Sequence, residues 1–425
     1  MKSFKITERE GIAYSKKSGD NNEIHLNDLA GYNSIFGEKI CHGTFVLEKI
    51  FKIINLSKIL NNQNNLKIKA HFYHQTNYNK KIIIKKSKKN FFEIFQDNKK
   101  IIELLILKKF KKENKKIFNP DRTKTFKNKY FPKNYEKNLY FVLSVLSKYV
   151  GKFYPGKYSI IKEIELDFNC SKLIEKKKIY IRSKRFKKKF PLIDNHLISK
   201  NITINFLSLI RPKYKNDVTK LNRTLINKVK KIKYNALIVG GSQGIGRKIY
   251  EILKNNKKII KIITYNKNLI SSNNNKTYLI KLNILKNNFK LDYYIKKFAP
   301  LRIFYFASPK ILFDEKLSKE KFKELKLFFL DFPEKILSRV LTHKLSFFYP
   351  STLNIDQDKF SDYSKIKLQA EQKLSKICAK NKIIFKTLRL PAINSRQSVS
   401  LLNPNPISLN KYLNSNYKSF KKIFL

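Results

Sequence analysis

The chain has 425 residues, enough for two or three domains with a sizeable core. It carries 92 Lys and Arg against 31 Asp and Glu, a formal net charge of +61, which would suit nucleic acid or an anionic surface as partner. The excess is almost all Lys and is spread over every segment, with no Trp. We therefore expect Lys at solvent-facing positions and neither nucleic acid nor a membrane as partner, and we keep a basic binding protein as the alternative hypothesis.

Cysteine usage and the N-terminus indicate the compartment. Cys41, Cys170 and Cys378 lie far apart and match neither metal-ligand nor disulfide spacing. No signal-peptide core and no apolar run of membrane-spanning length is present. We expect a cytoplasmic protein without a metal site.

The stretch 18–43 reads SGDNNEIHLNDLAGYNSIFGEKICHG. Asp20 and His25, five positions apart, can present a carboxylate and an imidazole to one pocket. That pair suits water activation, because one group takes a proton while the other holds or returns one. Gly43 precedes a helical pattern over 45–56, and an N–H at a helix start can face a developing oxyanion.

This stretch resembles the MaoC-like, R-specific enoyl-CoA hydratase family. The matching residues, in order and spacing, are Ala13-Tyr14, Ser18-Gly19-Asp20, Asn22, Ile24-His25, Ala30, Ile40 and His42-Gly43. The resemblance implies that Asp20 and His25 activate water and that the Gly43 N–H binds the thioester oxygen. Glu23 stands where the family usually has Pro, and Asn27 where an Asp is common.

The pattern after this stretch occurs twice. In the first occurrence, a helix is followed by strand-like segments at 66–72, 81–86, 91–95 and 101–110. We interpret the basic stretch 111–137 as a linker. In the second occurrence, a helix at 139–153 is followed by strands at 160–168, 177–186 and 202–210. With the family resemblance, this order implies an α+β double hot dog: a catalytic copy at 1–115 and a second copy at 116–212. The second copy has no Asp-x4-His, so we predict that it is non-catalytic, with His196 on a surface loop.

After a basic connector at 213–233, residues 235–253 read NALIVGGSQGIGRKIYEIL. They predict an apolar strand, a glycine-rich turn and an amphipathic helix. Gly240, Gly244 and Gly246 let the backbone bend tightly and approach a pyrophosphate, which the helix N-terminus can bind.

This module resembles the short-chain dehydrogenase/reductase family, whose first turn often reads T-G-G-S-x-G-I-G. The resemblance implies an α/β Rossmann-type domain, a doubly wound parallel sheet, over 234–425. Ser242 and Ile245 would then lie with the three glycines at the cofactor. Further strands are expected at 258–266, 277–284, 301–309, 344–352 and 382–393.

The cofactor preference is inferred from the residues at the ends of the second and third expected strands. The second ends in Tyr265-Asn266-Lys267, without the acidic residue that would hold the ribose diol of NAD. Asn266 and Lys267 therefore favour NADP, with NAD as the alternative. Asn283 falls where the family commonly has an adenine-contacting Asp.

Tyr363 and Lys367 are four residues apart on an expected helix, so both lie on one face. We expect the lysine charge to lower the pKa of the tyrosine, making it a usable acid and base. Ser351 stands 12 residues before Tyr363 (363 − 351). The resemblance implies that Ser351 orients a carbonyl, Tyr363 protonates it, and Lys367 also holds the nicotinamide ribose. The family's catalytic Asn has no convincing counterpart at 322–340.

These observations predict a bifunctional enzyme of fatty-acid-like metabolism. One site would dehydrate a 3-hydroxyacyl thioester of CoA or acyl carrier protein, or hydrate the enoyl product; the other would reduce the 3-oxoacyl thioester with NAD(P)H. The alternative is a hydratase whose reductase-like domain is degenerate. A homodimer is compatible with the sequence.

Overall fold

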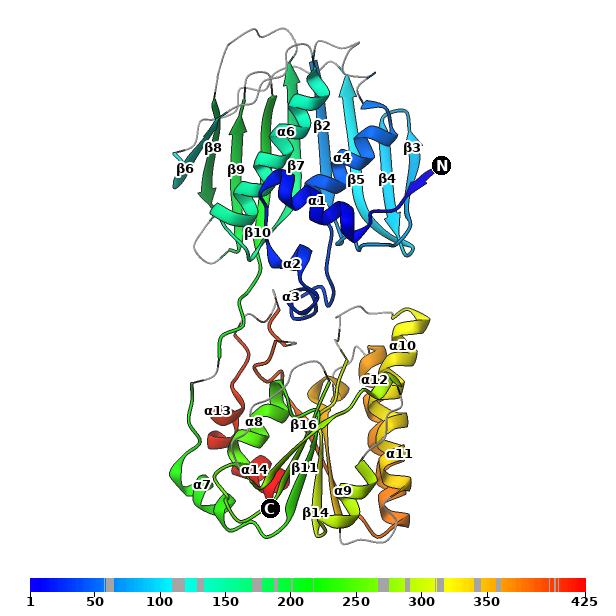
Figure 1. Cartoon of the computed structure of the whole chain (residues 1–425), viewed down its shortest axis with the longest axis vertical. Helices are drawn as coiled ribbons and strands as arrows, with labels where there is room; N and C mark the ends of the chain where they lie inside the picture. Colours follow the sequence, from blue (N-terminus) through cyan, green and yellow to red (C-terminus); the bar gives the residue numbers. More distant parts are fainter. Residues whose placement is uncertain are drawn as a thin grey trace. The chain divides into compact units, whose positions relative to one another are not determined.

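A computed structural model of the chain (Figure 1) describes residues 1–56, 58, 65–108, 119–127, 134–169, 178–186, 190–199, 202–216, 218–266, 275–286, 291–309, 311, 317–339, 345–356, 361–396, 398–400, 403 and 405–425. The chain divides into two units, Met1–Lys213 and Tyr214–Leu425. Each unit has its own core, and each is described by itself.

The first unit contains one ten-stranded antiparallel sheet, in the order β1-β3-β4-β5-β2-β7-β10-β9-β8-β6. The strands are β1 (Lys2–Phe4), β2 (Asn65–Phe72), β3 (Ile82–Lys88), β4 (Phe91–Gln96), β5 (Lys99–Lys108), β6 (Arg122–Lys127), β7 (Ser159–Asn169), β8 (Lys178–Arg185), β9 (Leu192–Ile198) and β10 (Ile202–Ile210). The helical elements are α1 (Glu8–Ser18), α2 (Glu23–Leu26), α3 (Asp28–Tyr32), α4 (Gly43–Ile53), α6 (Tyr135–Lys148) and the π-helix η1 (Tyr149–Phe153).

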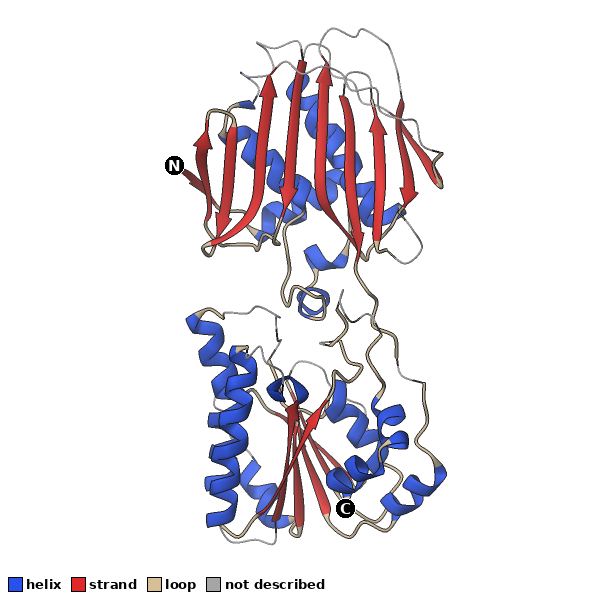
Figure 2. Ribbon diagram, turned by 180° about the vertical axis from the view of Figure 1, so that it is seen from behind, coloured by secondary structure: helices blue, strands red, loops and turns tan. Residues whose placement is uncertain are grey.

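The order of the strands has an internal symmetry. The run β3-β4-β5-β2 is matched by β8-β9-β10-β7, β2 pairs with β7 at the centre, and β1 and β6 close the two edges. The helices α4 and α6 lie side by side on one face of this sheet (Figure 1). Seen from behind, the other face carries no helix among the described residues (Figure 2). The expected repetition of a helix followed by antiparallel strands is therefore present.

Alternation along β7 explains why one face is covered. Ile164, Leu166 and Phe168 are buried, whereas the intervening acidic residues are only half-buried. Period-two alternation of this kind builds a sheet with one apolar face. The apolar face packs on α4, where Val46 and Ile50 are fully buried in the same core.

Two predictions for the first unit were wrong. Residues of the expected linker form the edge strand β6, which pairs with β8. His196 lies in β9 rather than in a loop, and its ring Nδ1 is hydrogen-bonded to Asn205 Oδ1 on β10. Cys170 and most of the expected linker lie outside the described residues.

The second unit contains a six-stranded parallel sheet in the order β13-β12-β11-β14-β15-β16, the doubly wound Rossmann-type order. The strands are β11 (Asn235–Val239), β12 (Lys261–Tyr265), β13 (Thr277–Lys281), β14 (Leu301–Tyr305), β15 (Leu345–Thr352) and β16 (Ile384–Leu390). The helical elements are α7 (Arg223–Lys230), α8 (Gly244–Leu253), η2 (Ile284–Lys286), α9 (Leu291–Lys297), α10 (Lys319–Lys326), η3 (Leu327–Asp331), α11 (Phe332–Ser338), η4 (Leu353–Asp356), α12 (Asp362–Lys380), α13 (Leu409–Ser415) and α14 (Tyr417–Phe424). The predicted Rossmann-type domain is present.

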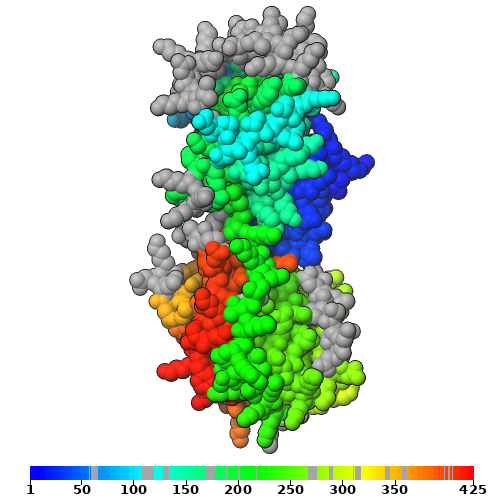
Figure 3. All heavy atoms as spheres, turned by 90° about the vertical axis from the view of Figure 1, so that its left-hand side faces the viewer, coloured from blue at the N-terminus to red at the C-terminus, as the bar shows by residue number. Residues whose placement is uncertain are grey.

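Helices cover both faces of this parallel sheet (Figure 1). Along β11, Leu237 and Val239 belong to the core beneath α9, α11 and α12, whereas Ala236 and Ile238 belong to the core beneath α7, α8, α13 and α14. Burial on both faces explains why β11 reads as a continuous apolar run. The C-terminal residues, red in Figure 3, lie against the green residues that begin the unit, and Tyr234 Oη donates to Phe424 O at 2.6 Å.

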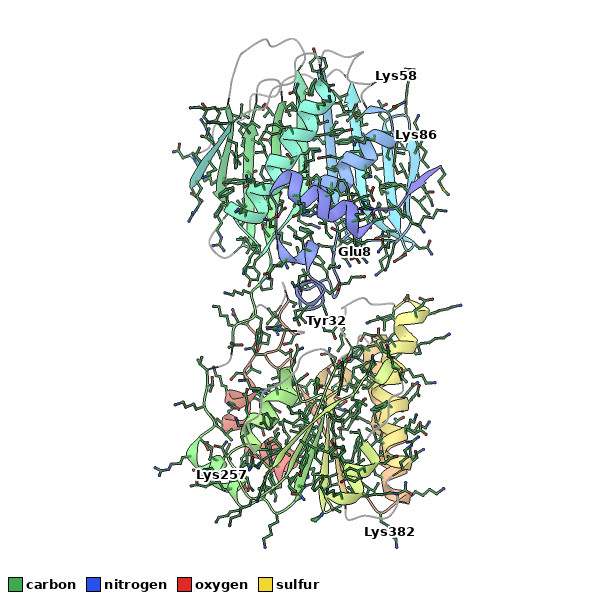
Figure 4. The ribbon with its side chains drawn as sticks, in the orientation of Figure 1. Glu8, Tyr32, Lys58, Lys86, Lys257 and Lys382 are labelled. Carbon is green, nitrogen blue, oxygen red and sulfur yellow. The ribbon has the colours of Figure 1, made fainter. Side chains whose placement is uncertain are left out.

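The surface of both units carries many lysines. Lys86, Lys257 and Lys382 are exposed, and Figure 4 shows their side chains pointing away from the ribbon. Within the described residues, no helix combines the length and the apolar content needed to cross a bilayer.

Candidate functional site

The turn after α1 positions Asp20. The helix α1 begins with a capping box in which Thr7 Oγ1 accepts from Glu10 N and Glu10 Oε2 accepts from Thr7 N. It ends at Gly19, whose φ of +76° lies in the left-handed region that favours glycine. The chain reverses there, and Asp20 follows with only 4% of its surface exposed.

Both halves of the first unit hold the Asp20 carboxylate. Asn22 N donates to Oδ1 at 3.2 Å, and the Ser147 hydroxyl, from α6, donates to Oδ2 at 2.7 Å. Gly151, in η1, lies so close that a Cβ there would stand 2.1 Å from Oδ1. Sequence analysis missed Ser147 and Gly151, because nothing in the second half repeats the catalytic motif.

His25 lies on the short helix α2 beside Asp20. Its Nδ1 is 2.8 Å from Ile40 O, and because a carbonyl only accepts, Nδ1 carries the proton and Nε2 keeps a lone pair. The His42 ring stacks on His25 at 3.8 Å between centroids, with His42 Nε2 3.2 Å from Asp20 O. Polar atoms of Asp20, His25 and His42 all lie within 4.8 Å of one another.

Burial shifts the pKa values of Asp20 and His25 in opposite directions. It raises the pKa of Asp20 and lowers the pKa of His25 well below its usual range, helped by the neighbouring His42 charge. His25 is therefore a neutral base at neutral pH, and Asp20 holds a proton more readily than an exposed carboxyl group does. Three such atoms at this spacing could also ligate a metal ion, so a metal-free site stays a prediction.

Gly43 is the first residue of α4, directly after His42. The cap residue His42 makes no side-chain hydrogen bond to the helix start. The first N–H groups of a helix have no intrahelical acceptor, so Gly43 presents a donor beside the cluster. A Cβ at Gly43 would lie 3.2 Å from the Phe72 ring, and glycine thus keeps this approach open.

The glycine-rich turn after β11 has the predicted tight geometry. Gly240 has φ +81°, and a Cβ there would meet Ala307 N at 2.5 Å; a Cβ at Gly246 would meet Gly240 O at 2.4 Å. Gly244 has φ +57°, but its Cβ would meet nothing closer than Ser395 Cβ at 3.7 Å. Gln243, the cap of α8, makes no side-chain bond to the helix. The first N–H groups of α8 therefore remain available, as a phosphate site requires.

The other predicted cofactor residues occupy the same end of the parallel strands. Ser242 and Ile245 are half-buried in the turn and at the start of α8. Asn266 follows β12 and is exposed. Asn283 follows β13, and its Oδ1 accepts from Leu285 N at 3.1 Å, a local turn bond. Lys267 lies outside the described residues.

Ser351, Tyr363 and Lys367 come from β15 and α12. Ser351 is 6% exposed, and its hydroxyl has no hydrogen-bond partner among the residues that the structure describes. Tyr363 packs edge-on against Phe329 at 5.6 Å between centroids. Lys367 Nζ donates to Pro350 O at 2.7 Å and lies over two aromatic rings, those of Phe329 and Tyr349.

The expected coupling between Tyr363 and Lys367 was wrong for this structure. Burial raises the pKa of Tyr363, and burial lowers the pKa of Lys367 to about 7. The predicted decrease in the tyrosine pKa is absent because the ammonium is directed to Pro350 O and the rings. Position on one helix face did not suffice to pair the two groups.

Comparisons with known proteins give fold-level likenesses. No protein-family model matches the chain, and no curated protein matches it. The chain is similar to a UDP-glucuronic acid 4-epimerase from Bacillus cereus in complex with NAD (15% identity, TM-score 0.31, 37% of this chain, 56% of that chain). It is also similar to a short chain dehydrogenase family protein from Francisella tularensis (20% identity, TM-score 0.33, 44% of this chain, 80% of that chain). A short chain dehydrogenase from Leptospira borgpetersenii with bound NAD+ is similar as well (15% identity, TM-score 0.36, 49% of this chain, 92% of that chain). The chain spans about half the length of the UDP-glucuronic acid 4-epimerase structures.

The Ser147 bond gives a pH-dependent prediction. Ser147→Ala removes a donor that favours the Asp20 carboxylate, so the pKa of Asp20 rises. In an NMR titration profile of the Asp20 carboxyl group, the midpoint should move to higher pH, and Ser147→Thr should restore it. Ser144→Ala is the control, since Ser144 is equally buried on α6 but donates to Phe141 O. A profile that Ser147→Ala leaves in place would contradict the role of Ser147.

The glycine turn gives a stability prediction. Gly240→Ala should lower the free energy of unfolding by about 2–5 kcal/mol, because it adds left-handed strain and a backbone clash. Gly244→Ala adds strain in open space and should cost about 1–2 kcal/mol. Denaturant unfolding of the two variants measures the difference, and equal losses would show that the close approach to Ala307 is unimportant.

Proposed function

We propose that the first unit is a MaoC-like double hot dog that hydrates an enoyl thioester or dehydrates its 3-hydroxyacyl product. The observation that carries the proposal is the convergence of Asp20 and His25, whose pKa values burial shifts in opposite directions. The symmetric sheet, with α4 and α6 packed on one face, supports the double hot dog assignment. CoA or acyl carrier protein is the proposed carrier.

The residues divide the proton transfers between them. His25 Nε2 accepts a proton from water as the water oxygen bonds to C3 of the enoyl thioester. The electrons of the double bond move towards the thioester oxygen, and the Gly43 N–H stabilises the resulting negative charge. Asp20 gives a proton to C2, and a proton passing from His25 to Asp20 restores both groups. Dehydration is the reverse sequence.

Asp20→Asn and His25→Ala should each lower the rate of crotonyl-CoA hydration on the order of 10²–10⁴-fold, because each removes one proton-transfer group. The loss of absorbance of the conjugated thioester measures the rate. Asp28→Asn and His71→Ala are matched controls, because both residues lie in the same unit with substantially exposed side chains. Undiminished hydration in either site variant would refute the assignment.

For the second unit we propose a short-chain dehydrogenase/reductase domain that binds a nicotinamide cofactor. The close-packed turn at Gly240 and Gly246 and the uncapped start of α8 fit a pyrophosphate. The lack of an acidic residue at Tyr265-Asn266 favours NADP over NAD.

A 3-oxoacyl reductase is the second candidate activity, and the unpartnered, buried hydroxyl of Ser351 favours it. When bound, the cofactor would supply the hydride. Ser351 would donate a hydrogen bond to the substrate carbonyl, and Tyr363, which burial keeps protonated, would give that oxygen its proton. The arrangement of Lys367 favours the alternative, a domain that binds cofactor without reducing a thioester.

NADPH binding and turnover separate these alternatives. The wild-type chain should bind NADPH and oxidise it with an acetoacetyl thioester. Gly244→Val should weaken binding at least about tenfold, because its side chain would enter the space in front of α8 without a close clash in the protein. Binding without turnover would leave a cofactor-binding, non-reducing domain. Absence of binding would contradict the proposal for this unit.

A further inference from the structure

A buried arginine lies beside the hydratase site without a counter-ion. Arg211 follows β10 and is only 5% exposed. Its Nη2 donates to Lys157 O at 2.6 Å, its Nε has no partner, and no carboxylate of the described residues pairs with it. The guanidinium stays charged at neutral pH, since burial lowers its pKa only to about 10. A buried, uncompensated charge is costly unless it serves an incoming anion.

The guanidinium shares a hydrogen-bond acceptor with the loop that carries Asp20 and Asn22. Lys157 O, which accepts from Arg211, also accepts from Asn22 Nδ2 at 3.1 Å. Two aromatic rings flank the group, with the Phe36 centroid 5.7 Å and the Tyr158 centroid 5.9 Å from Cζ.

We propose that Arg211 binds a carboxylate on the acyl group of the substrate, so that the hydratase acts on thioesters of dicarboxylic acids. Forked N–H donors match a carboxylate. The phosphates of CoA or of a carrier protein lie at the far end of the pantetheine arm from the reacting carbons. An anion bound by Arg211, which shares Lys157 O with Asn22 of the Asp20 loop, is therefore expected at the acyl end. This proposal rests on the proposed hydratase function.

The test compares two thioesters that differ in one group: crotonyl-CoA and the analogue in which a carboxylate replaces its terminal methyl group. The full-length wild type should have the higher kcat/KM for the carboxylated thioester. Arg211→Met should lower that value on the order of 100-fold, mainly through KM, and leave crotonyl-CoA hydration within a few fold. Arg211→Lys keeps the positive charge but loses the forked pair of N–H donors. Its kcat/KM for the carboxylated thioester should therefore lie between the values of the wild type and Arg211→Met.

The matched control is Lys213→Met, because Lys213 is an exposed cation near the same Tyr158 ring. It should leave both thioesters unaffected. Equal losses for both thioesters in Arg211→Met would overturn the proposal, since Arg211 would then act on the thioester they share or on folding. The absence of any preference in the wild type would overturn it too.

Failure of the underlying hydratase function has a different signature, namely that the wild type turns over neither thioester. Equilibrium binding by calorimetry then still decides the role of Arg211. Tighter binding of the carboxylated thioester that is lost in Arg211→Met supports the proposal, and equal binding of the two thioesters refutes it.

Discussion

The architecture of the first unit depends on keeping one carboxylate out of water. A buried carboxylate is stable only when hydrogen-bond donors replace its hydration. For Asp20 these donors are a backbone N–H of its own loop and a hydroxyl of α6, and Gly151 leaves the space in which the carboxylate fits. The half of the unit without a catalytic motif therefore forms one wall of the site. The helices α4 and α6 pack against each other, which helps to set the distance between Asp20 and Ser147 on α6.

The two units use buried charge differently. In the first, burial shifts the pKa values of Asp20 and His25 in opposite directions, which supports the proposed proton transfer between them. In the second, burial lowers the pKa of Lys367 to about 7, and its Nζ donates to Pro350 O and lies over two aromatic rings. The glycine turn satisfies the steric requirements of a phosphate site. However, Lys367 does not lower the pKa of Tyr363, as the proposed reduction would require. Hydration by the first unit and reduction by the second are both proposals, and they rest on different residues.

Sequence periodicity predicted most strands because alternation or continuous apolar runs reflect which faces are buried. It failed for β6, whose residues are nearly all exposed and carry no pattern. It failed for β9 because a core position is polar: Asn195 is fully buried, where it bonds Ser183 and Ser208. The motif predicted that Asp20 and His25 would lie close together, and their polar atoms lie within 4.8 Å of each other. Their partner Ser147 could not be predicted, since its contact with Asp20 spans 127 positions and resembles no repeat.

The central pairing of β2 with β7 has a consequence for biosynthesis. A chain emerging from the ribosome presents the catalytic loop long before α6 and β7 exist. Until then the loop lacks its hydroxyl donor and the sheet has an unpaired edge, a state prone to association with other chains. Because the decisive contacts are so distant in sequence, folding of these 213 residues should be slow and cooperative. Activity would then appear only after nearly the whole first unit has been synthesised.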